Sequence, residues 1–167
     1  MFLSRVFTLY PDYFPGYLDK GLFGKSKGKE WNLEIINIRD YALDKHKTVD
    51  DTPYGGGNGM IMKADVLASS LDANVKSGEK TIYLSPRGKV FNSKLAREFS
   101  NENSINLICG HFEGVDERIL ESRNIEEISI GDFILSGGEV AAFVVIDSIL
   151  RFIPVSYTHL RAHETNS

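Results

Sequence analysis

Short apolar runs alternate along this chain with stretches in which apolar residues recur at helical spacing. A run of about four to eight apolar and β-branched residues predicts a strand, whereas an apolar residue every third or fourth position predicts a helix. The predicted strands are residues 2–9, 33–38, 81–85, 105–109 and 127–130, and the predicted helices are residues 11–20, 64–71, 93–99, 116–122 and 140–153. Because helices separate most of the strands, the pattern predicts an α/β fold with a mostly parallel sheet and helices on both faces.

The last predicted helix, residues 140–153, is apolar on almost every face. Ser136 and Glu139 precede it with the spacing of a capping box, in which the hydroxyl accepts a bond from an amide of the first turn and the carboxylate reaches back to the cap. A helix that is apolar all round is buried, either in the core of its own chain or against a partner subunit. The sequence leaves both arrangements open.

The hydrophobic pattern stops at Pro154. Residues 155–167 read VSYTHLRAHETNS and have no apolar period. They are either a frayed terminus or a segment foreign to the protein, and we favour the second. The sequence therefore predicts one domain over residues 1–154 and a non-native tail over residues 155–167.

Composition narrows the class of protein. The chain has 167 residues, of which 42% are apolar and 25% charged, as in a single globular domain. Its net charge of −4 excludes a broadly basic coat for nucleic acid but not a local basic patch. The single cysteine permits no internal disulfide, and no apolar stretch approaches the ~20 residues of a membrane span. With no signal-peptide pattern after Met1, we expect a cytoplasmic protein that has no contact with membranes.

Glycine-bearing loops follow three of the predicted strands. They are residues 83–88, 109–114 and 130–138, which read YLSPRG, CGHFEG and IGDFILSGG. Ligands of parallel sheets bind beyond the carboxyl ends of the strands, where glycines let backbone amides approach closely. Any one of these glycines could simply end a strand, but three such loops in succession favour a ligand site. A lone cysteine cannot anchor a zinc site, so we predict no metal centre.

The loops also carry a family resemblance. The segments YLSPRG, CGHFEGVDER, SIGDFILSGGE, IDS and RFIP, with KHKTVDDTPYGGGNGM at residues 45–60, closely resemble the bacterial tRNA (guanine-N1)-methyltransferases, the TrmD family of the SPOUT superfamily. The resemblance runs from Met1 to Pro154 in the family's order. It implies a deep trefoil knot in the C-terminal part of the sheet, a homodimer, S-adenosylmethionine as cofactor, and methyl transfer to N1 of the guanine immediately 3′ of the anticodon in tRNA.

Roles follow from the resemblance position by position. It implies that the cofactor contacts Tyr83, Leu84, Ser85, Pro86, Gly110, Glu113, Gly114, Ile130, Gly131, Asp132, Phe133, Ile134, Leu135, Gly137 and Gly138. It implies that Asp50, Tyr54, Gly55, Gly56, Gly57 and Gly59 lie at the guanine of the tRNA. Arg151 would stabilise the negative charge that develops on the guanine oxygen. Taken alone, Arg151 is explained more simply by an ion pair with Asp147, one helical turn away.

The resemblance stops where family members continue into a helical domain. It implies that this further domain grips tRNA and supplies the aspartate that deprotonates guanine N1. We therefore expect a truncated, weakly active core of the methyltransferase. Two alternatives stay open: a dimeric S-adenosylmethionine-binding module without methyltransferase activity of its own, and another SPOUT enzyme that methylates RNA. Whether Mg²⁺ is required is also open.

Overall fold

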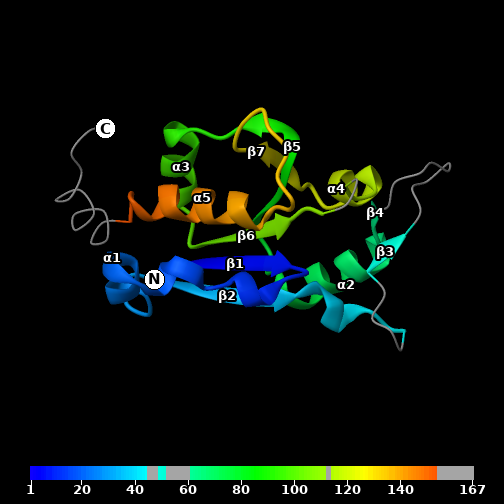
Figure 1. Ribbon diagram of the computed structural model, residues 1–167, viewed down its shortest axis with the longest axis horizontal. Coiled ribbons are helices and arrows are strands. Elements are labelled where there is room, and N and C mark those ends of the chain that lie inside the picture. The colour runs from blue at the N-terminus through cyan, green and yellow to red at the C-terminus, as the bar shows by residue number, and fades with distance from the viewer. Residues whose placement is uncertain (45–48, 52–60, 112–113, 154–167) are drawn as a thin grey trace.

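The computed structural model describes residues 1–44, 49–51, 61–111 and 114–153 (Figure 1). The strands are β1 (Phe2–Thr8), β2 (Trp31–Asn37), β3 (Asp50–Asp51), β4 (Ile61–Met62), β5 (Lys80–Val90), β6 (Ser104–Cys109) and β7 (Glu126–Ser129). The helices are α1 (Gly21–Ser26), α2 (Ala64–Asn74), α3 (Ser93–Ser100), α4 (Glu117–Ser122) and α5 (Glu139–Leu150), with 3-10 turns η1 (Pro11–Tyr13), η2 (Gly16–Asp19) and η3 (Ile38–Tyr41). The tail predicted over residues 155–167 lies outside the described residues.

One parallel sheet organises the fold. Its five strands lie in the order β2-β1-β6-β5-β7, and every pairing between neighbours is parallel. Strands β3 and β4 form a separate antiparallel pair. All residues of β6 are buried, as expected for a parallel strand covered on both faces. The predicted α/β fold with a mostly parallel sheet is confirmed.

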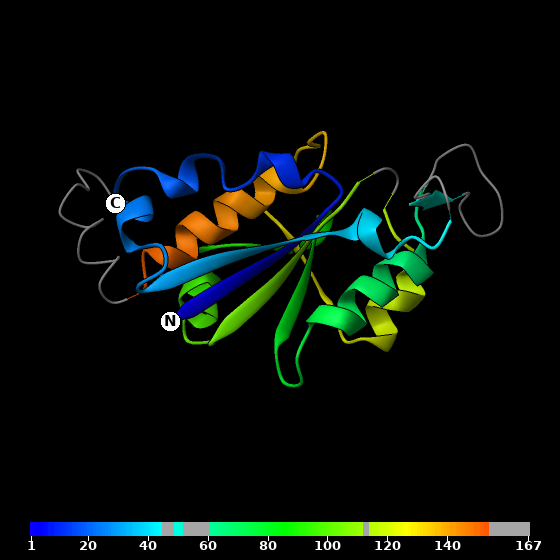
Figure 2. The same ribbon diagram turned by 90° about the horizontal axis from the view of Figure 1, so that it is seen from below.

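Alternate residues of the strands point into two hydrophobic cores. Val6, Ile82 and Leu107 face the core that includes α3 and α5, whereas Phe7 and Ile108 face the core that includes α2 and α4. Figure 2 shows α2 and α4 side by side at one end of the molecule, and α5 beside the segment that carries η2 and α1 at the other. The period of two along each strand therefore places helices on both faces of the sheet.

A buried arginine joins four strands of the sheet. Arg5 of β1 is only 2% exposed, and its guanidinium donates to Glu34 of β2, to Asn106 of β6 and to Glu79, which immediately precedes β5. The donor–acceptor distances are 3.3, 2.7 and 2.8 Å respectively. Burial acts to raise the pKa of Glu79, but hydrogen bonds, that from Ser104 foremost, outweigh it and lower the pKa to about 2. Glu79 is therefore ionised at neutral pH.

Replacing Glu79 by glutamine should lower the free energy of unfolding by about 2 kcal/mol at pH 7, because the buried guanidinium of Arg5 loses an ionised acceptor. The folded-state pKa is lowered, so this stabilisation is present above about pH 4.5 and is lost as the pH falls towards 2. Urea denaturation of both proteins should give a large difference at pH 7 and a small one at pH 2. An equal difference at the two pH values would contradict the ion pair.

The helix predicted over residues 11–20 is wrong. This segment forms the two 3-10 turns η1 and η2, which are separated by Phe14 and Pro15. Pro15 has no amide hydrogen with which to continue a helix, and Gly16 has a φ of +56°, in the left-handed region. The regular helix, α1, begins only at Gly21.

The predicted capping box is also wrong. The N-cap of α5 is Gly138, which makes no side-chain cap bond, and Ser136 is exposed. The Glu139 carboxylate instead accepts a hydrogen bond from Thr8 at the end of β1. The hydrogen bond from Thr8 thus takes the place of the predicted bond between Glu139 and the helix cap.

Helix α5 is not covered all round within one chain. Its face towards the sheet is buried, but Val140 and Val144 are 49% and 39% exposed. The described helices include none that is both long enough and apolar enough to cross a membrane.

Candidate functional site: a pocket at the strand ends

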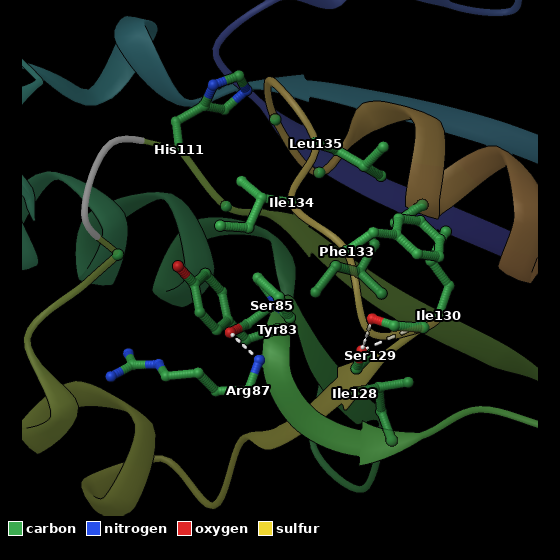
Figure 3. A pocket seen from close by; sticks show the side chains of 18 of the residues that line it. Tyr83, Ser85, Arg87, His111, Ile128, Ser129, Ile130, Phe133, Ile134 and Leu135 are labelled. Carbon is green, nitrogen blue, oxygen red and sulfur yellow. Dashed lines mark hydrogen bonds between the residues drawn. The ribbon is translucent and has the colours of Figure 1, made fainter.

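A pocket of about 410 Å³ opens where β6 and β7 end and where β5 bulges (Figure 3). Strand β5 pairs with β7 on either side of the bulge, which lies between Leu84 and Lys89. The bulge pushes Ser85, Pro86 and Arg87 out of the ladder and into the pocket lining. The volume lies in the range of small-molecule sites, roughly 300–1,000 Å³.

Most of the residues that the resemblance assigns to the cofactor line this pocket. They are Tyr83, Leu84, Ser85, Pro86, Gly110, Gly114, Ile130, Gly131, Phe133, Ile134, Leu135, Gly137 and Gly138. Asp132 is exposed and is not part of the lining, and Glu113 lies outside the described residues. Three segments that are distant in sequence thus meet at one place, because β5 pairs with both β6 and β7. The first segment is the bulge inside β5, where the sequence predicted a loop after a strand, and the other two are the loops after β6 and β7.

The lining contains further residues that the resemblance does not assign to the cofactor. They are Arg87, His111, Ile128, Ser129, Ser136 and Ala141. Arg87 and His111 are the ones with cationic or titratable side chains. The signal that could have found them is a basic side chain within a glycine-bearing loop at a strand end.

Two of the loops touch through glycine backbone. The amide of Gly138 donates to the carbonyl oxygen of Gly110 at 2.8 Å. A Cβ on Gly138 would lie 2.6 Å from the Gly110 nitrogen and 2.8 Å from the Cys109 Cα. Because backbone atoms cannot move aside as a flexible side chain can, any side chain at residue 138 would push the loops apart.

The pocket has an apolar wall and a polar wall. Figure 3 shows Phe133, Ile134 and Leu135 on one side, with Tyr83 and Arg87 across from them. Burial, and then the nearby carboxylate of Glu127, raise the pKa of Tyr83 to about 12, so that its hydroxyl stays neutral at physiological pH. A flat apolar group carrying a charged tail fits these two walls, and a nucleoside derivative such as S-adenosylmethionine has that character.

Arg151 lies far from this pocket in the same chain. It is the C-cap residue of α5, and residues 138–151 span about 20 Å of helix at 1.5 Å per residue. Asp147, its predicted partner, accepts a hydrogen bond from the Tyr17 hydroxyl at 2.6 Å.

Of the residues predicted to meet the guanine, the structure describes the backbone of Asp50, which belongs to β3. Tyr54, Gly55, Gly56, Gly57 and Gly59 lie outside the described residues. Among the residues that the structure describes, no three His, Cys, Asp or Glu side chains gather where they could hold a metal ion.

Comparison with known proteins identifies the family. The family model for tRNA (Guanine-1)-methyltransferase TrmD matches residues 2–167. The chain belongs to the TrmD family. It is 66% identical over 155 residues to the tRNA (guanine-N(1)-)-methyltransferase of Pelagibacter ubique (strain HTCC1062), a match that covers 92% of this chain and 68% of the relative.

Two further relatives match this chain at lower identity. Identity is 54% over 154 residues with the protein of the same name from Bartonella quintana (strain Toulouse), covering 92% of this chain and 66% of the relative. It is 48% over 167 residues with that of Brucella canis, covering 99% and 68%. The chain therefore spans about two thirds of the length of these relatives.

Proposed function

We propose that this chain is the S-adenosylmethionine-binding core of a tRNA (guanine-N1)-methyltransferase, which methylates N1 of the guanine immediately 3′ of the anticodon. One observation carries the proposal: the loops with the family's sequence pattern line a single pocket. The names of the relatives support the reaction. The proposal includes tRNA as substrate, the cytoplasm as location and the family's deep trefoil knot.

The pocket residues would bind the cofactor through shape and backbone hydrogen bonds. Backbone groups of Ile130, Phe133 and Leu135 would contact the adenine, while Gly110 and Gly138 leave room for close approach. When bound, S-adenosylmethionine would supply a methyl group on a sulfonium for attack by guanine N1. The apolar wall would exclude water from the reacting atoms.

Arg151 would act on the guanine rather than on the cofactor. When N1 loses its proton, negative charge develops on the oxygen of the base, and a guanidinium can stabilise it. About 20 Å of helix separates Arg151 from Gly138 in one chain. This separation favours a second copy of the chain as the source of the arginine, so the proposal includes a homodimer.

The exposed apolar face of α5 is the proposed dimer contact. Replacing Val144 by aspartate should weaken the dimer about 30-fold or more, because a charge would be buried without a partner. Sedimentation at tens of micromolar should give a dimer for the wild type and monomer for the variant. Val90→Asp is a matched control, since Val90 is 63% exposed on β5. A monomeric wild-type protein would contradict the contact.

Residues 1–154 taken by themselves should be much less active than the relative from Pelagibacter ubique. At saturating tRNA, methyl transfer by residues 1–154 should be at least ~10²-fold slower than by that protein, because the resemblance implies that the general base lies outside these residues. The measurement is transfer of labelled methyl to a tRNA transcript, beside calorimetry with S-adenosylhomocysteine. Near-equal turnover would place the base within residues 1–154.

The same experiment separates the alternatives. Cofactor binding without any transfer would favour the binding module. Transfer to a transcript in which the target guanine is replaced would favour another SPOUT methyltransferase. If the folded protein does not bind S-adenosylhomocysteine at millimolar concentration, the proposal is wrong.

A further inference from the structure

A buried carboxylate lies next to a glycine of the pocket lining and has no role in the proposed reaction. Glu139, the first residue of α5, is 1% exposed. Its two carboxylate oxygens lie 2.7 and 2.9 Å from Nε2 of His111, and Oε2 also accepts from the Thr8 hydroxyl at 2.6 Å. Burial acts to raise the pKa of Glu139, but the bonds from His111 and Thr8 outweigh it and lower that pKa. An ionised carboxylate only accepts, so Nε2 of His111 carries the proton.

This cluster joins three separate segments of the chain. His111 comes from the loop after β6, Glu139 from the start of α5, and Thr8 from the end of β1. The Tyr10 ring packs on the imidazole, with ring centroids 4.9 Å apart, and the Tyr10 amide donates to the Thr8 hydroxyl at 2.9 Å. Each polar group of the cluster thus supports the next, and His111 has little freedom to turn.

The imidazole lies directly against the glycine loop of the pocket. A Cβ on Gly137 would lie 2.1 Å from Cε1 and 2.6 Å from Nε2 of His111. The neighbouring Gly138 amide is the one that bonds to the Gly110 carbonyl. The side-chain pair therefore acts beside that backbone bond, and together they fix the separation of two loops that line the pocket.

We propose that His111 and Glu139 are positioning residues for cofactor binding: their hydrogen bond holds the loop after β6 against the glycine loop before α5 in the arrangement that the cofactor requires. The inference rests on the proposed function, since it takes S-adenosylmethionine as the ligand. Glu139 acts through His111 and the loops, with no contact to the reacting atoms. Because the loops are already ordered in the free protein, less conformational entropy is lost when the ligand binds, and affinity is higher.

Two substitutions of His111 by an amide side chain test whether the hydrogen bond to Glu139, and not merely the presence of the ring, supports cofactor binding. Glutamine places its amide nitrogen the same number of bonds from Cα as Nε2, whereas asparagine places it where Nδ1 lies. His111→Asn should therefore lose the bond to Glu139 and weaken S-adenosylhomocysteine binding by about tenfold or more, the scale of a hydrogen bond to a charged group. His111→Gln should recover most of that loss. The readout is the dissociation constant by calorimetry, with thermal unfolding measured alongside.

Glu79→Gln provides the control for general destabilisation, because Glu79 lies among the amino ends of the strands, away from the pocket. The inference is overturned if His111→Asn binds as tightly as the wild type, if both amides weaken binding equally, or if Glu79→Gln weakens it as much. If His111→Asn does not fold, Glu139→Gln decides, and it should weaken binding by several-fold. A wild-type protein that does not bind the ligand contradicts the proposed function instead.

Discussion

Gly138→Ala should weaken binding of S-adenosylhomocysteine at least ~100-fold, because even one methyl group would separate two loops of the pocket. The φ of Gly138 is −78°, which alanine adopts readily, so the effect would come from space and not from backbone strain. The new Cβ would meet backbone atoms of Cys109 and Gly110, which have no rotamer by which to withdraw. The measurement is the ligand-induced rise in melting temperature, which falls as affinity falls.

Gly78→Ala is the matched control for this experiment. Gly78 has a φ of +83°, so alanine there costs about 1 kcal/mol of stability, yet no atom lies within 4 Å of the added Cβ. This variant should melt earlier than the wild type but respond to ligand equally. If Gly138→Ala responds to the ligand as fully as the control does, close approach of the loops is not what the site requires.

Arg151→Ala should reduce methyl transfer to tRNA by about 10²–10³-fold while leaving the cofactor dissociation constant close to that of the wild type. The reason is that the two ends of α5 have different roles: the N-terminal end lines the pocket, whereas Arg151 is the C-cap residue at the other end. Transfer is measured at saturating tRNA, so that weaker docking is not mistaken for lost chemistry. A parallel loss of cofactor affinity would contradict this division.

Mixed dimers test whether the arginine comes from the partner. Gly110→Val should close the pocket, because a Cβ there would lie 2.7 Å from the Tyr83 hydroxyl. If pocket and arginine belong to different protomers, Gly110→Val and Arg151→Ala should be inactive alone but recover about a quarter of wild-type activity when mixed freely, from one working site in each mixed dimer. If both belong to one protomer, mixing restores nothing.

Local signals in the sequence were enough for the sheet and for the pocket loops. The apolar runs at residues 105–109 and 127–130 and the glycine loops after them carry their own pattern, and parallel strands bring their carboxyl ends to one edge whatever their order. The strand order itself depends on contacts between distant residues, such as Val6 with Leu107, which no periodicity records.

Two of the failures share a cause, because each concerns a residue whose partner is remote in sequence. Glu139 has the spacing of a cap, yet its carboxylate bonds to Thr8, 131 positions earlier. His111 matched no chemical motif, because its role depends on a hydrogen bond to Glu139, 28 positions later in the chain. The helix predicted over residues 11–20 failed for a local reason. Pro11 at the first turn favoured a helix, but the segment is interrupted at Phe14 and Pro15.

The hydrogen bonds of Arg5 also bear on the register of the strands. Arg5 lies level with Glu34 and Asn106 in the strand pairing, and it bonds to both as well as to Glu79. If one of these strands slipped by one residue, it would shift by about 3.3 Å along its neighbour. The polar side chain that bonds to Arg5 would then point to the other face of the sheet. The Arg5 network therefore specifies the register of the paired strands. It holds β1, β2 and β6 in the one register that keeps the buried Arg5 guanidinium beside Glu34 and Asn106.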